Sequence, residues 1–278
     1  MTRPFVLALA LLGAPGLVAA APETSGAITT KTSAATTKKP RTAAKKKQKK
    51  KQKKKRSRAR SGPSRYAKVE DVPTTAAWRY GQMTQDECEA ELTTRAISFI
   101  REPTSRGVRA PVRLTGRLHG VEFRTDESDA QRATSPYEVS DCRLILAIDD
   151  FSEILEAHDV VQVRHYSMWR PPAKDWPADQ DGTRHAGALA LDAGRFTRAD
   201  GTTLDVDRDF HGGIDEKTCG EDARPHPATP DALELRAILC ETAAEHMFNV
   251  VLTPNFNRPH HNHFHLEVTS GVKWFLLH

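Results

Sequence analysis

Near its C-terminus the chain reads Pro259-His260-His261-Asn262-His263-Phe264-His265-Leu266-Glu267-Val268, and four of its 12 histidines fall within six residues of this stretch. Apolar and polar residues alternate over its second half, which predicts a short β-strand. Because alternate side chains of a strand share a face, we expect His263 and His265 on one face and Phe264 and Leu266 in a core. Two imidazoles held side by side favour a metal ion, and Zn²⁺ is a usual partner of neutral imidazole.

A second pair of polar residues lies upstream, at the two ends of the segment His185-Ala-Gly-Ala-Leu-Ala-Leu-Asp192. The residues between are small or apolar, so we expect a buried segment that holds His185 and Asp192 in place. Together with His265 they would supply two nitrogens and one oxygen. Three protein ligands leave the fourth position of a zinc ion to water, as in catalytic sites. The sequence therefore predicts one Zn²⁺ ion, and the alternative is a set of ordinary polar residues in a core.

The order of these motifs resembles the bacterial extensin-like C-terminal domain family. That family is placed within the metallopeptidase superfamily of lysostaphin, D-Ala-D-Ala carboxypeptidase and hedgehog-type domains. The resemblance runs from about Cys88 to the C-terminus, and the matching pieces are Ser167-Met-Trp-Arg170, the His185 to Asp192 segment, the Cys219 and Cys240 pair, and His260-His-Asn-His263-Phe-His265. Two positions depart from the family pattern. Ala188 stands where a glycine is usual, and Asn262 stands where an aspartate is common.

The resemblance implies hydrolysis of peptide or amide bonds in bacterial peptidoglycan by a zinc-activated water. His263 resembles the histidine of the superfamily that does not bind the metal, which implies that it shuttles a proton or stabilises the oxyanion. Arg170 would hold a substrate carbonyl or carboxylate through charge-assisted hydrogen bonds, or else form a structural ion pair. Ser167 and His260 would lie behind the ligands and orient them. Glu267 shares the strand face of the histidines, and a surface or salt-bridged glutamate is a simpler expectation for it than a base.

Residues 1–20 have the features of a secretory signal peptide. Arg3 provides the charged start, Phe5 to Val18 form an apolar stretch, and Val18-Ala-Ala20 is a small-residue cleavage site. The apolar stretch is short for a bilayer span, so we expect it to be cleaved and the mature chain to have no transmembrane helix. An exported protein, in the periplasm or outside the cell, would meet a cell-wall substrate.

The chain has four cysteines, an even number, which predicts disulfides in a protein expected to be exported. The count alone allows three pairings, and buried free thiols are the alternative. The family resemblance and the order along the chain suggest that Cys88 pairs with Cys142 and that Cys219 pairs with Cys240.

Basic residues are concentrated near the N-terminus. Residues 31–60 hold sixteen Lys or Arg and no acid, within a segment, 21–73, that we expect to be disordered. Of the 41 basic residues, 17 precede position 61, whereas only one of the 36 acidic residues does. Residues 61–278 therefore hold 24 basic and 35 acidic residues, a net charge of −11. The polycation would bind anionic envelope polymers or lipid headgroups, or serve as a solvated spacer. Nucleic acid is a less expected partner of an exported protein.

Residues 74–278 are long enough for one domain with a sizeable core. We expect an α+β fold with a small, mainly antiparallel sheet and packed helices, because helices and strands mix without a βαβ rhythm. The expected elements are helices from Thr84 to Pro103, over 142–157 and over 230–249, a hairpin over 112–123, a strand over 160–168 and the final histidine-bearing strand. A non-catalytic envelope-binding protein, with a structural zinc ion or none, is the alternative to a zinc peptidase.

Overall fold

The computed structural model describes residues 66–278. The signal peptide expected at 1–20 and most of the segment expected to be disordered, 21–73, lie outside the described residues. Within the described residues the first element is β1 (Tyr66–Ala67), which pairs with the last strand, β11 (Phe275–Leu277), and lies ahead of the domain start expected at residue 74. Among residues 66–278, no helix is both long enough and apolar enough to span a membrane.

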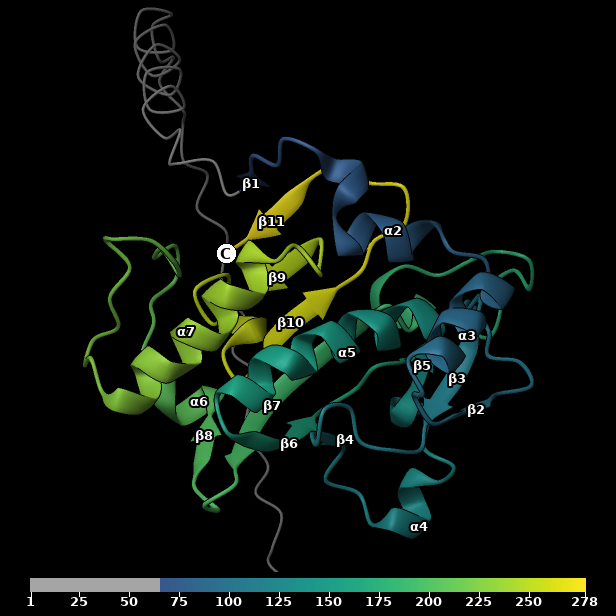
Figure 1. The fold of residues 1–278 in the computed structure, drawn as a ribbon, viewed down its shortest axis with the longest axis horizontal. Coiled ribbons are helices and arrows are strands. Elements are labelled where there is room, and N and C mark those ends of the chain that lie inside the picture. Colours follow the sequence, from purple (N-terminus) through teal and green to yellow (C-terminus); the bar gives the residue numbers. More distant parts are fainter. Residues whose placement is uncertain (1–65) are drawn as a thin grey trace, which may run out of the picture. The chain divides into compact units, whose positions relative to one another are not determined.

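Helices and strands are interspersed along the described chain (Figure 1). In chain order they are β1 (Tyr66–Ala67), α2 (Ala76–Gln82), α3 (Gln85–Thr94), β2 (Phe99–Arg101), β3 (Pro111–Leu114), β4 (Glu122–Arg124), α4 (Asp129–Arg132), β5 (Val139–Asp141), α5 (Cys142–Ala157), β6 (Val160–His165), β7 (Ala190–Arg198), β8 (Thr203–Asp205), α6 (Val206–Asp209), α7 (Pro230–Ala244), β9 (Val250–Leu252), β10 (Phe264–Glu267) and β11 (Phe275–Leu277). Short 3₁₀ turns include Arg184–Gly187 and Arg258–His260. The predicted α+β class is confirmed.

The larger sheet has the strand order β1-β11-β9-β10-β7-β6-β4, with β8 paired to β7, and β2, β3 and β5 form a separate small sheet. Within the described chain the pairing is antiparallel except between β11 and β9 and between β4 and β6. The prediction of a hairpin over 112–123 is wrong, because β3 and β4 belong to different sheets. Phe123 of β4 is instead paired with Val163 of β6, and both side chains are buried.

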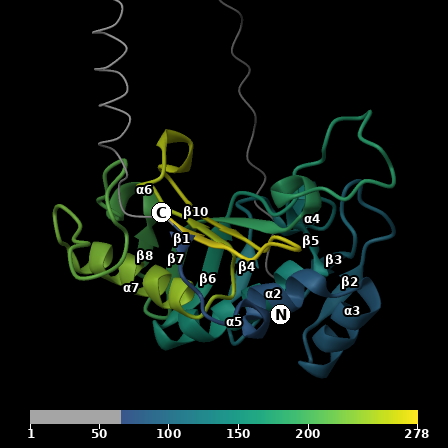
Figure 2. The same cartoon turned by 90° about the horizontal axis from the view of Figure 1, so that it is seen from above.

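Helix α5 packs against the larger sheet and forms much of the core. Leu144, Ile148, Phe151 and Leu155 recur at helical spacing and are completely buried. Seen from above, α5 and α7 lie on the same side of strands β6, β7 and β10 (Figure 2). The helix predicted over 142–157 is confirmed in its bounds. The opposite face of the sheet is left for polar side chains.

Helices α3 and α7 both end earlier than the sequence analysis expected. After α3 ends at Thr94, Ala96 has a left-handed backbone (φ 56°), and the chain continues as strand β2 rather than running on to Pro103. After α7 ends at Ala244, His246 is likewise left-handed (φ 53°). A right-handed helix cannot pass through such a residue.

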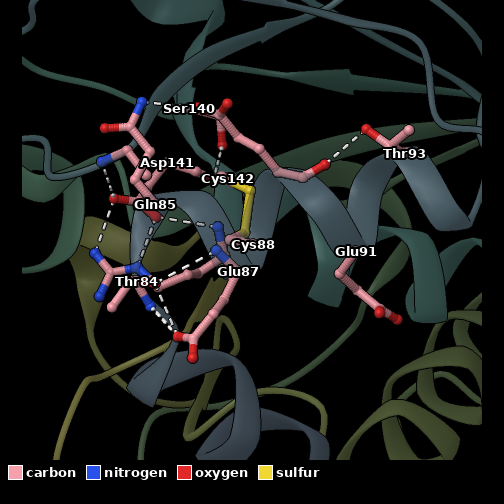
Figure 3. Close-up of a disulfide and its surroundings, with 12 residues drawn as sticks. Thr84, Gln85, Glu87, Cys88, Glu91, Thr93, Ser140, Asp141 and Cys142 are labelled. Atoms are coloured by element: carbon pink, nitrogen blue, oxygen red, sulfur yellow. Dashed lines mark hydrogen bonds and ion pairs between the residues drawn. A yellow bond between two sulfur atoms is a disulfide. The ribbon is translucent and has the colours of Figure 1, made fainter.

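The two disulfides have the pairing that the family resemblance suggested. Cys88 is bonded to Cys142, and Cys219 is bonded to Cys240. Figure 3 shows the first bond joining α3 to the start of α5, close to the capping box in which Thr84 and Glu87 bond to each other's backbone N–H. This bond therefore fixes one end of the central helix to its neighbour.

Candidate metal centre

The register between strands β10 and β7 brings His265 directly opposite Asp192. Directly opposite residues of an antiparallel pair share a face, so the two side chains meet. Nδ1 of His265 lies 2.9 Å from Oδ1 of Asp192. Phe264 and Leu266 are completely buried on the other face, with the helices, as the alternation predicted.

Two more histidines reach the same carboxylate oxygen of Asp192. Nε2 of His185, in the turn that leads into β7, lies 3.1 Å from Oδ1, and Nε2 of His263 lies 3.3 Å from it. His185, Asp192 and His265 place their ligand atoms within 4.8 Å of one another, so the structure brings together all three expected metal ligands. Asp192 is only 1% exposed.

His260 extends this cluster, whereas its neighbour His261 does not. His260, His263 and His265 also place one ligand atom each within 4.8 Å of one another. The ring of His260 lies 5.2 Å from that of His263 and 5.6 Å from that of His265, centroid to centroid. His261 is largely exposed, with Nδ1 bonded to the backbone oxygen of Arg258. We define the histidine cluster as His185, His260, His263 and His265.

Every ring of the histidine cluster is held from outside by an oxygen. Three rings donate Nδ1–H to an oxygen that can only accept: His185 to the backbone oxygen of Met168 (3.1 Å), His260 to Oδ1 of Asn257 (2.7 Å) and His263 to Oδ1 of Asn262 (2.8 Å). His265 donates instead from Nε2 to Glu267 (3.2 Å). A neutral imidazole carries one N–H, so the other nitrogen of each ring has a lone pair.

Three of these lone-pair nitrogens, those of His185, His263 and His265, face an anion. Burial would raise the pKa of Asp192, but the hydrogen bonds that these three rings donate when they carry a proton on the inward nitrogen hold the pKa below its usual value, so Asp192 is ionised. Burial would lower the pKa of His265, but hydrogen bonds with Asp192 and Glu267 raise it above its usual value. Burial and the neighbouring rings lower the pKa of His260 to about 4, so this ring stays neutral at pH 7.

Charging all the rings of the histidine cluster would cost too much in repulsion, whereas one divalent cation satisfies the lone pairs and the carboxylate together. The residues fit a metal ion.

Arg170 and Ser167 lie on the outer side of Asp192. Nη2 of Arg170 binds Oδ2 of Asp192, and Nε of Arg170 donates to Oγ of Ser167 at 2.9 Å. Both residues therefore hold the carboxylate in place. The Arg170 side chain is 54% exposed, and its Nη1 makes no hydrogen bond to any residue in 66–278, so it is also available to a ligand.

Tyr166 is a residue of this site that the sequence analysis missed. Nδ2 of Asn262 donates to its hydroxyl at 3.3 Å, and the ring packs edge-on against His263 at 5.8 Å. A Cβ on Gly194 of β7 would lie 2.9 Å from the Tyr166 ring, so the glycine leaves room for this aromatic side chain. The sequence could have indicated Tyr166, because this residue directly precedes Ser167 near the end of a predicted strand.

Glu267 is buried rather than on the surface. It is 3% exposed, and Oε1 accepts a hydrogen bond from Thr269 at 2.7 Å while Oε2 holds His265. The salt-bridged glutamate expected from the sequence thus lies behind His265, one of the expected metal ligands, and orients its ring.

The turn that carries His185 is tightly folded. A Cβ on Gly187 would lie 2.3 Å from the backbone oxygen of Gly182, so no larger residue fits there. Ala188, where the resemblance led us to expect a glycine, has a left-handed backbone (φ 52°). The turn keeps its shape at a cost of about 1–2 kcal/mol for the alanine.

The fold and the cluster define a class of protein: an α+β domain with a buried His–Asp cluster, able to hold a divalent cation, on the face of its sheet away from the helices. The chain belongs to the family described as extensin-like protein C-terminus, which matches it over residues 86–275. This match includes the histidine cluster, Asp192, Arg170 and all four cysteines. No curated protein and no solved structure matches the chain.

Proposed function

We propose that this protein is an exported zinc-dependent hydrolase that cleaves peptide or amide bonds in peptidoglycan, within the metallopeptidase superfamily of lysostaphin and D-Ala-D-Ala carboxypeptidase. The proposal rests mainly on one observation. In His185 and in His265 the nitrogen that has the lone pair points toward the ionised Asp192. His263 adds a nitrogen on the same side of this site, in the place of a proton carrier.

His185, Asp192 and His265 would hold the metal. Two imidazole nitrogens and one carboxylate oxygen suit Zn²⁺, and three ligands are the number found in catalytic zinc sites. When bound, zinc supplies a Lewis acid that polarises the scissile carbonyl and makes a water nucleophilic near neutral pH. Ser167 and Arg170 keep Asp192 oriented for this task.

His263 is poised to move a proton at Nε2. Its Nδ1–H is bound to Asn262, so in the neutral ring Nε2 has the lone pair and faces the site. The ring can take a proton from the attacking water and return it to the leaving amine. Asn262 retains this orientation although the family commonly has an aspartate there.

Arg170 would bind the substrate through the nitrogen that Asp192 and Ser167 leave open. Nη1 is the donor that a substrate carbonyl or terminal carboxylate can reach beside the metal. Because Arg170 also binds Asp192, it would link the position of the substrate to that of a metal ligand.

The proposed location and substrate have separate supports. The two disulfides and the lack of a membrane-spanning helix among residues 66–278 are compatible with export. Peptidoglycan as the substrate follows from the superfamily resemblance. The sixteen cations of residues 31–60 would hold the enzyme on anionic polymers of the envelope.

The test is a digest of purified peptidoglycan and soluble muropeptides by the zinc-loaded chain 21–278, with products read by mass spectrometry. We expect new peptide fragments from the wild type and none from His185→Ala or His263→Ala, with zinc still bound in His263→Ala. His261→Ala is the matched control, because this exposed neighbour lies outside the cluster, and it should cleave normally. If the folded, zinc-containing wild type cleaves none of these substrates, the proposal is wrong.

A non-catalytic envelope-binding protein is the second candidate, and the Lys-rich segment favours it. Sixteen positive charges in residues 31–60 neutralise anionic polymers without any contribution from the histidines. Co-sedimentation with cell walls would then be lost on deletion of 31–60 and unchanged in His185→Ala.

A further inference from the structure

The histidine cluster contains a second group of possible ligands that the proposed catalytic zinc does not use. His260 and His263 place ligand atoms within 4.8 Å of each other and of His265. Their outward nitrogens are both engaged by side-chain amide oxygens, of Asn257 and Asn262. Each neutral ring therefore keeps a lone pair on Nε2 for a cation.

The amide of Asn262 is itself held in one orientation. Its Nδ2 donates to the hydroxyl of Tyr166 at 3.3 Å, so its oxygen is the atom that faces Nδ1 of His263. His260 is fixed in a different way, since its ring packs edge-on against Phe256 at 5.3 Å. The contacts that orient the two rings from outside thus involve neither His185 nor Asp192, and Nε2 of His263 lies 3.3 Å from Oδ1 of Asp192, beside the first position.

The two groups of ligands share His265, so only one of two neighbouring zinc ions can bind it, and that ion is held more strongly. Nδ1 of His265 lies against Asp192 and can serve one cation at a time. An ion held by His185, Asp192 and His265 has three protein ligands, whereas an ion beside it has two nitrogens of its own and completes its shell with water. Affinity for zinc rises with the number of protein ligands, so the second position fills after the first.

We propose that His260 and His263 form a second, weaker zinc position next to the catalytic one, and that filling it inhibits the enzyme. The inhibition rests on the proposed function, because His263 acts there as the proton carrier. A cation bound at Nε2 of His263 occupies the lone pair that would accept the proton. Excess zinc therefore removes the proton carrier while the catalytic ion stays in place.

Zinc stoichiometry of the folded chain 21–278, measured by equilibrium dialysis, tests the second position directly. We expect two ions per wild-type chain, of unequal affinity, and one ion in His260→Ala. His260→Gln, which keeps a polar side chain of similar length, should also bind one, and circular dichroism would verify that both variants fold. His261→Ala, the exposed neighbour, should still bind two.

Zinc titration of peptidoglycan hydrolysis tests the consequence. Wild-type turnover should rise up to one equivalent of zinc and fall in excess, whereas turnover of His260→Ala should not fall in excess. A single ion per wild-type chain overturns the second position, as does a fall of equal size in both proteins. A single ion that His260→Ala binds less tightly also overturns it, since His260 would then be a ligand of the first ion.

His185→Ala separates this inference from the proposed function. The proposed function requires this variant to lose the tighter ion. A weaker ion that remains in His185→Ala supports the second position, and its loss there overturns the independence of the two sites.

Discussion

At the scale of single residues, the centre depends on oxygens that lie behind its histidines. Burial would raise the pKa of Glu267, but hydrogen bonds with His265 and Thr269 lower it, so this carboxylate is charged inside the protein. A charged acceptor behind a ligating histidine fixes the ring and makes its other nitrogen more basic. Glu267 is thus a positioning residue for His265.

Replacing this charge tests the role of Glu267. In Glu267→Gln the side chain keeps its shape but loses its charge, and we expect zinc to bind about 10–100-fold more weakly. Competition with a chromophoric chelator measures the affinity. Glu153→Gln, at an exposed glutamate, is the control and should bind zinc as the wild type does. Equal affinity in the two variants would contradict the positioning role.

The turn that carries His185 gives a second prediction at this scale. A Cβ in Gly187→Ala would collide with the backbone of Gly182, so we expect a loss of about 3 kcal/mol in the free energy of unfolding. The matched change is Ala188→Gly one residue later, where the left-handed backbone suits glycine, and it should alter stability by no more than about 1 kcal/mol. Urea denaturation compares the two, and similar losses would show that backbone shape does not govern this turn.

At the scale of elements, a histidine links two helices that lie side by side. His158, at the end of α5, donates from Nδ1 to Glu234 (2.6 Å) and from Nε2 to Glu241 (3.0 Å), both on α7. Burial would lower its pKa, but these two hydrogen bonds raise it above its usual value. The ring is therefore positively charged when it joins the helices.

This contact makes stability depend on pH in a defined direction. The folded pKa is raised, so the stabilisation is complete below the unfolded value of about 6.5 and is lost as pH rises through the folded value. We expect His158→Gln to lower Tm at pH 5.5 by more than at pH 9. Differential scanning calorimetry at both values measures this, with His226→Gln at an exposed histidine as control. A deficit that grows toward pH 9 would reverse the sign and exclude this role.

At the scale of the whole molecule, two disulfides tie distant segments together. The Cys88–Cys142 bond closes a sequence separation of 54 residues and joins α3 to α5, whereas Cys219–Cys240 closes 21 residues and fixes a loop to α7. A bond that closes a longer loop removes more entropy from the unfolded chain. The first bond should therefore contribute more to stability.

Removing each bond separately tests that order. We expect the paired change Cys88→Ala with Cys142→Ala to lower the free energy of unfolding by about 4 kcal/mol, and Cys219→Ala with Cys240→Ala by about 3 kcal/mol. Guanidinium denaturation of the three proteins gives the values. A larger loss from the shorter loop would mean that native packing, and not loop length, sets the contribution of these bonds.

Elements held by local contacts were predictable from the sequence. The apolar spacing of Leu144, Ile148 and Phe151 predicted α5 within its bounds, because apolar residues at helical spacing indicate a helix without knowledge of its packing partners. The hairpin over 112–123 failed for the opposite reason. The pairing partner of β4 is β6, and no local pattern records that choice.

The sequence by itself determined the donor types of the centre: histidines at alternate strand positions and an aspartate after an apolar run. Only the tertiary structure decided which atoms meet. Asp192 and His265 are 73 residues apart, and strand register alone sets them face to face. The oxygens behind the rings, from Met168, Asn257, Asn262 and Glu267, come from loops and strand ends whose positions depend on the whole fold. A short motif specifies chemistry, whereas long-range hydrogen bonding and packing specify geometry.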